Sequence, residues 1–401
     1  MSSSQFYSKV VANPNILNRY NKVLAAIPNG AKALFNRNGA RFMINSVSPA
    51  SGTSASQVIQ FRILQVGRGV DRAYIQLTLN NGTASLWNGN LFNLIQTVRL
   101  LSADGGNVIA QVAQGLDLMR DFSLLSSESQ VANMSVSTNI STALTPGAGI
   151  PASSSQTFIL PLITSCPWEG FDDNFNLQFN GDLILELTTN DASYFTEAGT
   201  ASTLTITSPQ LILDTVEYTP SLQSQLKQSI LNGTYKFMFL ESLLYSNTLT
   251  MNASSTYNFT LSSLYGLCAS VYIGVYNNAT PAGRRTPIEM ESFQLLDSSG
   301  MNICGGNIIP FQLAQMETSF HFQNSYFPRF FPEIVYNFCD RPDLTMGQQI
   351  ASGFYPMTGF EQLQITTPST LGTASYTVYV SGRFYTTLGV DTSKNLVKMV
   401  S

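Results

Sequence analysis

Residues 98–109 read VRLLSADGGNVI, and residues 293–304 read FQLLDSSGMNIC. The two stretches lie 195 positions apart and share a Leu-Leu pair, a glycine and an asparagine at the same places. Each begins with strand-forming residues and runs into a polar cluster with glycine, which is typical of a strand followed by a turn. One such match could arise by chance, so evidence for a duplicated sequence has to come from further matches in the rest of the chain.

Further matches occur in the same order along both halves. SASQVIQF (54–61) aligns with NASSTYNF (252–259) at an offset of 198, and GDLILELTT (181–189) aligns with GFEQLQITT (359–367) at an offset of 178. The offsets drift slowly, as differences in loop length would make them. We therefore predict two tandem domains of one fold. The offset of 198 also matches Tyr74, Ile75 and Asn80 with Tyr272, Ile273 and Asn278.

Most of the chain alternates between apolar and polar residues in short runs bounded by turn signals. VIQFRILQV (58–66) and AYIQLTL (73–79) are examples. Strands of this kind bury one face and need a second sheet to cover it, which predicts a sandwich or jelly roll. Within the two domains, helices are expected over about 110–127 and, at the matching place in the second half, over 310–323.

One more helix is expected in the middle of the chain. TPSLQSQLKQSILNG (219–233) offers Thr219 as a cap, Pro220 for the first turn and a stripe of leucine and isoleucine, and it ends at Asn232-Gly233. Such a helix would connect the two domains. The predicted organisation is a basic arm (1–45), a first domain (46–219), a linker helix (220–232), a second domain (233–390) and a basic tail (391–401).

The composition indicates a protein that is buried against copies of itself. Charged residues make up 11% of the 401 residues, whereas about 25% is typical of soluble proteins. Interface cores are depleted of charge in the same way. The first residues, MSSSQFYSKV, have no apolar stretch like that of an export signal. The run LYGLCASVYIGVY (264–276) is too short for a membrane-spanning helix and is rich in strand formers.

Positive charge gathers at the two ends. The net charge is −4, yet no acidic residue precedes Asp71. Residues 13–27, NPNILNRYNKVLAAI, predict an amphipathic basic helix with Ile16, Tyr20, Leu24 and Ile27 on its apolar face. We expect both ends to face an anionic surface, although two solvated tails are the alternative. The basic residues expected to do so are Lys9, Arg19, Lys22, Lys32, Arg37, Arg41, Lys394 and Lys398.

The residue types that enzymes and metal sites need are scarce. His321 is the one histidine, with Glu317 four residues before it. A single histidine excludes catalytic triads and histidine-rich metal centres, and a partly buried structural side chain is expected instead. The acidic cluster of Glu169, Asp172 and Asp173 is expected to be a solvated loop. No catalytic, cofactor-binding or metal-binding residue is predicted. The cysteines lack metal or disulfide spacing and are expected to be buried free thiols: Cys166, Cys268, Cys304 and Cys339.

The duplicated strands, the linker helix and the closing run FYPMTGFEQLQITTPSTLGTASYTVYVSGRFYTTL (354–388) resemble the double jelly-roll major capsid proteins of tailless icosahedral viruses. That lineage includes membrane-containing phages (bacteriophages) and the adenovirus hexon. The likeness covers roughly residues 42–390 and is architectural, because no single motif is diagnostic. It implies an all-β chain of two tandem eight-stranded jelly rolls with a few short helices.

The resemblance also implies a function. Three copies would form a pseudo-hexameric capsomer of an icosahedral shell, with the basic termini facing an internal membrane or the genome. The implied partners are other copies of the chain, penton and minor capsid proteins, inner-membrane lipid, and nucleic acid contacted without sequence specificity. The protein would be a structural component of the virion, assembled in the host cytoplasm, with no enzymatic activity and no cofactor.

Two other classes of protein remain alternatives. A carbohydrate-binding or adhesin β-sandwich would present a platform of exposed aromatic residues, but the only tryptophans are Trp87 and Trp168. A glycoside hydrolase on a jelly-roll scaffold needs two carboxylates that face each other across a cleft, and the sequence does not identify such a pair.

Overall fold

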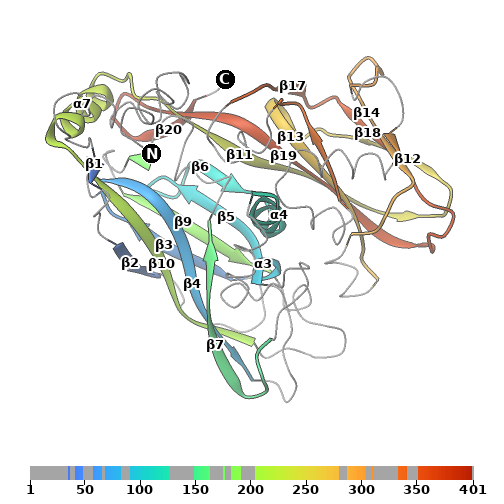
Figure 1. Ribbon diagram of the computed structural model, residues 1–401, viewed down its shortest axis with the longest axis horizontal. Coiled ribbons are helices and arrows are strands. Elements are labelled where there is room, and N and C mark those ends of the chain that lie inside the picture. Colours follow the sequence, from blue (N-terminus) through green and yellow to red (C-terminus); the bar gives the residue numbers. More distant parts are fainter. Residues whose placement is uncertain are drawn as a thin grey trace, which may run out of the picture.

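The computed structural model of the chain is dominated by strands (Figure 1). Within the described part of the chain the helices are α3 (Leu91–Leu94), α4 (Gly115–Leu125) and α7 (Pro220–Leu231). No described helix is long and apolar enough to span a membrane. The structure describes residues 35–36, 41–47, 57–65, 68–82, 91–125, 149–162, 175–176, 182–190, 204–279, 287–303, 309–310, 333–340 and 351–399.

The first domain contains two antiparallel sheets. One has the order β1-β10-β4-β7, with β2 also paired to β10 and β8 to β4, and the other has the order β3-β9-β5-β6. The strands are β1 (Phe35–Asn36), β2 (Arg41–Asn45), β3 (Val58–Ile63), β4 (Gly69–Asn81), β5 (Ile95–Leu101), β6 (Val108–Val112), β7 (Ser154–Pro161), β8 (Phe175–Asn176), β9 (Leu183–Thr189) and β10 (Leu204–Tyr218).

The second domain follows α7 and is built in the same way. Its sheets have the orders β11-β19-β13-β16, with β17 on β13 and β20 on β19, and β12-β18-β14-β15. The strands are β11 (Phe237–Met251), β12 (Thr256–Thr260), β13 (Tyr265–Asn277), β14 (Ser292–Leu296), β15 (Ile309–Pro310), β16 (Ile334–Asn337), β17 (Tyr355–Thr358), β18 (Gln362–Thr366), β19 (Ala374–Val390) and β20 (Leu396–Met399).

The two domains share one topology. When the accessory strands β1, β8, β17 and β20 are set aside, eight strands remain in each domain. Numbered in chain order, they form one sheet of order 1-8-3-6 and one of order 2-7-4-5 in both domains. This is the strand order of a jelly roll. The chain is therefore a double jelly roll, as the sequence predicted.

Equivalent hydrogen bonds confirm the predicted alignment residue by residue. The main-chain N–H of Gln57 donates to Thr189 Oγ1 at 2.9 Å, and that of Ser255 donates to Thr367 Oγ1 at 3.0 Å. In each pair the donor directly precedes the second of the domain's eight strands, and the threonine ends or directly follows the seventh. The offsets of 198 and 178 that relate these residues are the ones read from the sequence.

The repeated stretch that opens the sequence comparison is a strand and a turn in each domain. Leu100 in β5 and Leu295 in β14 pair with equivalent leucines of β9 and β18. In the turns that follow, Gly105 has a φ of +70° and Gly300 a φ of +82°. Each glycine N–H donates to the carbonyl oxygen three residues earlier, at 2.8 and 3.0 Å. A positive φ favours glycine, which explains why this residue recurs.

The apolar core of the first domain continues into the second. Inner-face side chains such as Phe61, Ile75 and Leu185 are fully buried between the two sheets. The same cluster includes Phe239 and Leu388 from the second domain. A separate cluster fills the rest of the second domain. The two jelly rolls are therefore packed against each other through hydrocarbon as well as through polar groups.

The sheets extend past the predicted domain limits at both ends. β2 pairs with β10 although residues 41–45 were expected in the basic arm, and β20 pairs with β19 although it was expected in the basic tail. Short alternating runs are enough to add a strand to an existing edge. The helix expected from residue 110 begins at Gly115 instead, because VIAQV first forms β6 against β5.

The linker helix α7 matches its prediction closely but lacks the predicted side-chain cap. Leu222 and Ile230 are buried on its inner face, and Gly233 follows its end with a φ of +71°. Thr219 occupies the cap position without a side-chain cap hydrogen bond. Its hydroxyl is buried and has no partner. The segments predicted as helices at 13–27 and over most of 310–323 lie outside the described residues.

Candidate functional site: the seam between the two domains

The helix α4 belongs to the first domain but packs against the second. It follows β6 and lies between the two domains in Figure 1. Asp117, Arg120 and Asp121 are spaced so that they share one side of the helix, and all three are at most 1% exposed. Their partners, described below, lie on the β11-β19-β13-β16 sheet.

Arg120 joins α4 to the edge of that sheet. Its Nη1 donates to Asp117 Oδ1 at 2.6 Å, which holds the guanidinium in place on its own helix. Its Nε and Nη2 donate to the two carboxylate oxygens of Glu333, the residue before β16. This bidentate geometry is the strongest form of arginine–carboxylate pairing. Gly274 leaves room for the carboxylate, since a Cβ there would lie 2.4 Å from Glu333 Oε1.

Arg383 of β19 makes the reciprocal contact from the second domain. Its Nη2 donates to Asp121 Oδ1 at 2.9 Å and its Nε to Asp121 Oδ2 at 3.2 Å. Its Nη1 lies 3.4 Å from Asp117 Oδ2. The guanidinium carbon stands 4.6 Å from the ring centre of Tyr272, a cation–π distance. The Tyr272 hydroxyl in turn donates to Asp121 at 3.0 Å.

Asp117 also fixes the helix to two adjacent strands of that sheet, β11 at its edge and β19 inside it. Its Oδ2 accepts from the hydroxyl of Ser242 in β11 and, at 2.8 Å, from that of Ser381 in β19. Tyr276 of β13 donates to Glu333. The helix is thus held by side chains from several neighbouring strands of the second domain. We call the five charged residues Asp117, Arg120, Asp121, Glu333 and Arg383 the interdomain cluster.

The interdomain cluster sets three carboxyl groups against two guanidinium groups with almost no access to water. Burial alone would raise the pKa of Asp117, but Arg383 and Arg120 outweigh burial and hold that pKa below its usual value. Burial dominates at Asp121 and raises its pKa, although Arg383 opposes the shift. Burial also raises the pKa of both Tyr272 and Tyr276 well above the usual value, so both phenols remain donors.

A second polar contact ties down the C-terminal strand. Glu241 in β11 is 1% exposed and accepts from Lys398 of β20 and, at 3.2 Å, from the Thr386 hydroxyl. Burial raises the pKa of Glu241, and Lys398 opposes that shift. Both β11 and β20 lie beside β6 of the first domain. The last described strand of the chain is therefore part of the contact between the two domains, which we call the seam.

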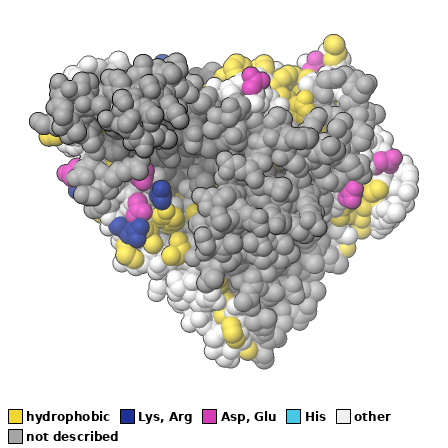
Figure 2. Space-filling view, viewed as in Figure 1, with side chains coloured by type: hydrophobic (Ala, Val, Ile, Leu, Met, Phe, Trp, Pro, Cys, Tyr) yellow, Lys and Arg dark blue, Asp and Glu magenta, His cyan; other side chains and the backbone are white. Residues whose placement is uncertain are grey.

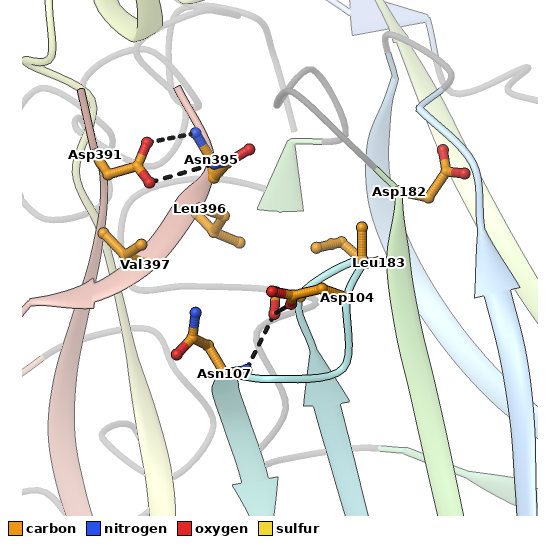
Figure 3. Close-up of a pocket in the computed structure, with 10 residues that line it drawn as sticks. Asp104, Asn107, Asp182, Leu183, Asp391, Asn395, Leu396 and Val397 are labelled. Carbon is orange, nitrogen blue, oxygen red and sulfur yellow. Dashed lines mark hydrogen bonds between the residues drawn. The ribbon is translucent and has the colours of Figure 1, made fainter. Parts of the chain in front are cut away.

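A crevice of about 240 Å³ opens where the β5–β6 turn and the start of β9 meet the β19–β20 turn (Figure 3). Its three carboxylates already have partners in the structure. Asp104 accepts from its own turn, Asp391 accepts from the main chain and side chain of Asn395, and Asp182 accepts from Arg62 at 2.6 Å. No group of metal-ligating side chains occurs among the described residues. We therefore assign no ligand to the crevice and describe it as a place where turns of the two domains meet.

Of the basic residues predicted to face an anionic surface, the described ones are Arg41, Lys394 and Lys398. Arg41 is 63% exposed and its Nε lies 2.6 Å from Asp214 Oδ1, while Lys398 pairs with Glu241. Lys394 lies in the β19–β20 turn. The others lie outside the described residues, as does the helix with Ile16, Tyr20, Leu24 and Ile27: Lys9, Arg19, Lys22, Lys32 and Arg37.

The cysteine prediction is confirmed for the two that are described. Cys268 and Cys339 form no disulfide and are buried, and burial raises the pKa of the Cys268 thiol. The remaining residues considered for chemistry or sugar binding fall outside the described part of the chain: Trp87, Cys166, Trp168, Glu169, Asp172, Asp173, Cys304, Glu317 and His321.

The sequence reasoning did not predict the interdomain cluster. Two signals were nevertheless present. GLDLMRDFSLL (115–125) carries three charges on one side of an otherwise apolar helix. The uncharged and mostly apolar run 264–276 is typical of a strand buried on both faces rather than one, and in the structure β13 is that strand.

Comparison with known proteins identifies the fold. No protein-family model matches the sequence, and no curated protein does. Among solved structures, a quasi-atomic model of the PBCV-1 virus capsid matches with a TM-score of 0.65 at 11% identity, covering 92% of this chain and 98% of the other. The Faustovirus major capsid protein matches with a TM-score of 0.62 at 9% identity, covering 97% and 98%. The mavirus major capsid protein matches with a TM-score of 0.51 at 10% identity, covering 92% of each chain. At these identities the likeness is one of fold.

Proposed function

We propose that this chain is a viral major capsid protein whose copies assemble into trimeric, pseudo-hexameric capsomers of an icosahedral shell. The observation that carries the proposal is the duplicated strand order, 1-8-3-6 over 2-7-4-5, in both halves of the chain. Support comes from the fold likeness to capsid proteins over nearly the whole length of both chains. Enzymatic activity has no part in this proposal.

The seam supplies what such an assembly requires mechanically. Three chains with two similar domains each can imitate a hexagon only if the angle between the domains is the same in every copy. A closed ring of identical contacts allows little angular error. The interdomain cluster restricts that angle, because its bidentate pairs have strict geometry and a small rotation would leave buried charges without partners.

Both termini of the chain would face an anionic surface, either an internal membrane or the genome. Each lysine or arginine close to anionic lipid contributes about 1 kcal/mol, and many copies on one shell add by avidity. Arg41 and Lys398 have carboxylate partners within the chain. The attraction would therefore depend mainly on the remaining basic residues of the arm and on Lys394. Penton and minor capsid proteins would be further partners of the shell, and any nucleic-acid contact would lack sequence specificity.

The mass of the protein in solution tests the assembly. We expect a stable particle of three times the 43.8 kDa of one chain, or a larger multiple of it. Light scattering coupled to gel filtration measures this directly. A monomer that binds glycans on an array would contradict the proposal and favour the adhesin class.

Deletion of residues 1–30 tests the role of the arm. The shortened chain should assemble as the full chain does, because the described sheets begin after this segment. Its binding to vesicles that contain anionic lipid should weaken, whereas neither protein should bind vesicles of zwitterionic lipid strongly. Unchanged binding to anionic vesicles would exclude the proposed role of the arm and leave the capsid proposal intact.

A further inference from the structure

The outer face of the second domain's larger sheet is covered, and the cover comes from the first domain. Tyr272 and Tyr276 point to that face from β13, are fully buried, and contact the interdomain cluster. The equivalent strand of the first domain, β4, is different. Its inward residues are buried in the core, whereas its outward residues Tyr74, Gln76 and Thr78 are partly exposed.

The two faces correspond closely. At the offset of 198 that relates β4 to β13, Tyr74 matches Tyr272 and Thr78 matches Tyr276. Asn80 donates to two hydroxyl groups of β10, at 3.4 and 3.1 Å. Asn278 donates to two hydroxyl groups at equivalent places on β19, at 3.5 and 2.7 Å. The same surface of the same fold is therefore covered in one domain and open in the other.

The open face is uncharged along most of its length and its side chains are held in place. Gln210 donates to Asn45 at 2.8 Å, Gln76 donates to Gln210 at 3.3 Å, and the hydroxyls of Thr78 and Thr157 lie 2.9 Å apart. In Figure 2 the described side chains at the bottom, over the lower ends of β4, β7 and β10, are white or yellow. Charge depletion is typical of interface cores, and side chains that are already ordered lose less entropy on binding.

We propose that the outer face of the β2-β10-β4-β7 sheet binds the second domain of another copy of this chain. Within one chain the first domain sits on the outer face of the second. Repeating that relation between chains places the second domain of one copy on the open face of the next. Such a head-to-tail contact forms a closed ring when the rotation that relates one copy to the next returns to the first copy after a whole number of steps. The inference rests on the proposed self-assembly and names the surface through which it occurs.

The substitution Thr78→Arg tests the surface. Thr78 lies on an inner strand of the sheet, points outward and is partly exposed, so the monomer should fold and keep its circular dichroism spectrum. An arginine there would be buried without a partner in the contact. We expect the trimer peak to be lost and a particle of one chain to appear in light scattering at the same protein concentration.

Thr366→Arg is the matched control. Thr366 lies on β18, also an inner strand, is partly exposed, and pairs with Thr256 across the strands at 3.3 Å as Thr78 pairs with Thr157. This variant should assemble like the unchanged protein. If both variants lose the trimer, the effect is not specific to the proposed face and the inference is wrong.

The failures of the two proposals are distinguishable. An unchanged protein that is a monomer would overturn the self-assembly itself. An unchanged protein that forms a trimer, together with Thr78→Arg that still does, would overturn only the assignment of this face. Should Thr78→Arg not fold, Thr157→Arg takes its place, because that side chain is more exposed and its substitution disturbs the monomer less. The same outcomes then apply.

Discussion

Asp117 and Asp121 lie one helical turn apart on α4 and are both buried, yet their pKa values move in opposite directions. Asp117 lies near both arginines of the interdomain cluster, so the fold favours its charged form. Asp121 also pairs with Arg383, but burial dominates there and the fold favours its protonated form. A carboxyl with a lowered pKa stabilises the fold above its unfolded pKa of about 3.9, and this stabilisation is lost as the pH falls through the folded pKa. For a raised pKa the sign reverses, and stability is lost as the pH rises.

The variants Asp117→Asn and Asp121→Asn should therefore respond to pH in opposite ways. At pH 7 the first should lower the free energy of unfolding by about 3 kcal/mol, because it removes the carboxylate from a buried ion pair. That deficit should shrink as the pH falls below about 4. The deficit of Asp121→Asn should be smaller at pH 7 and grow towards acid pH. Urea unfolding between pH 3 and pH 7 measures both slopes, and equal slopes would contradict the assignment.

Position 274 requires glycine because a larger residue would collide with its neighbours, and not because of the backbone conformation there. A Cβ at this position would lie 2.4 Å from Glu333 Oε1, so Gly274→Ala must displace the carboxylate that holds Arg120. We expect a loss of about 1–3 kcal/mol in the free energy of unfolding, the usual range for overpacking. Gly372→Ala is the control, because a Cβ there meets nothing within 4 Å. Equal midpoints for the two variants in thermal unfolding would show that Glu333 moves freely.

At the scale of single elements, local signals predicted some helices better than others. The linker α7 was predicted almost to the residue, because Pro220, the apolar stripe and Asn232-Gly233 all lie within the helix or next to it. α4 was predicted to begin too early, since VIAQV can continue a helical pattern as easily as a strand until its partner β5 is known. Strands β2 and β20 were assigned to the arm and the tail for the same reason, although strand-forming sequence was expected from about residue 42. Their pairing depends on β10 and β19, which are distant in sequence.

The start of α7 tests whether a residue at the cap position stabilises the helix when its side chain makes no cap hydrogen bond. Thr219 occupies the cap position, but its hydroxyl makes no cap hydrogen bond and is buried without a partner. Thr219→Val removes that hydroxyl with little change of shape. We expect the free energy of unfolding to change by less than about 0.5 kcal/mol or to rise, because an unsatisfied buried polar group is removed. A true cap would lose about 1 kcal/mol on such a change, and a loss of that size in chemical unfolding would restore the cap predicted from the sequence.

For the whole molecule, duplication was readable from the sequence but the seam was not. The repeat left four matching patches in the same order, and the equivalent hydrogen bonds of Thr189 and Thr367 confirm that alignment. The seam joins residues that share no local pattern. Arg120 and Glu333 are 213 positions apart, and Asp121 and Arg383 are 262 apart. Only the packed structure shows that their charges meet.

The interdomain cluster should make the two jelly rolls unfold together. Arg120→Leu leaves Glu333 buried without its arginine and removes one of the two arginines that face Asp117. Breaking a buried ion pair in this way destabilises a fold by about 3–5 kcal/mol. Because that loss falls on the contact between the domains rather than on either core, we expect one calorimetric transition for the unchanged protein and two for Arg120→Leu. Arg62→Leu is the matched control, since Arg62 is 63% exposed in its pair with Asp182 and surface pairs contribute only about 0–1 kcal/mol. A single transition in Arg120→Leu, merely shifted to lower temperature, would show that the shared apolar core couples the domains without the charges.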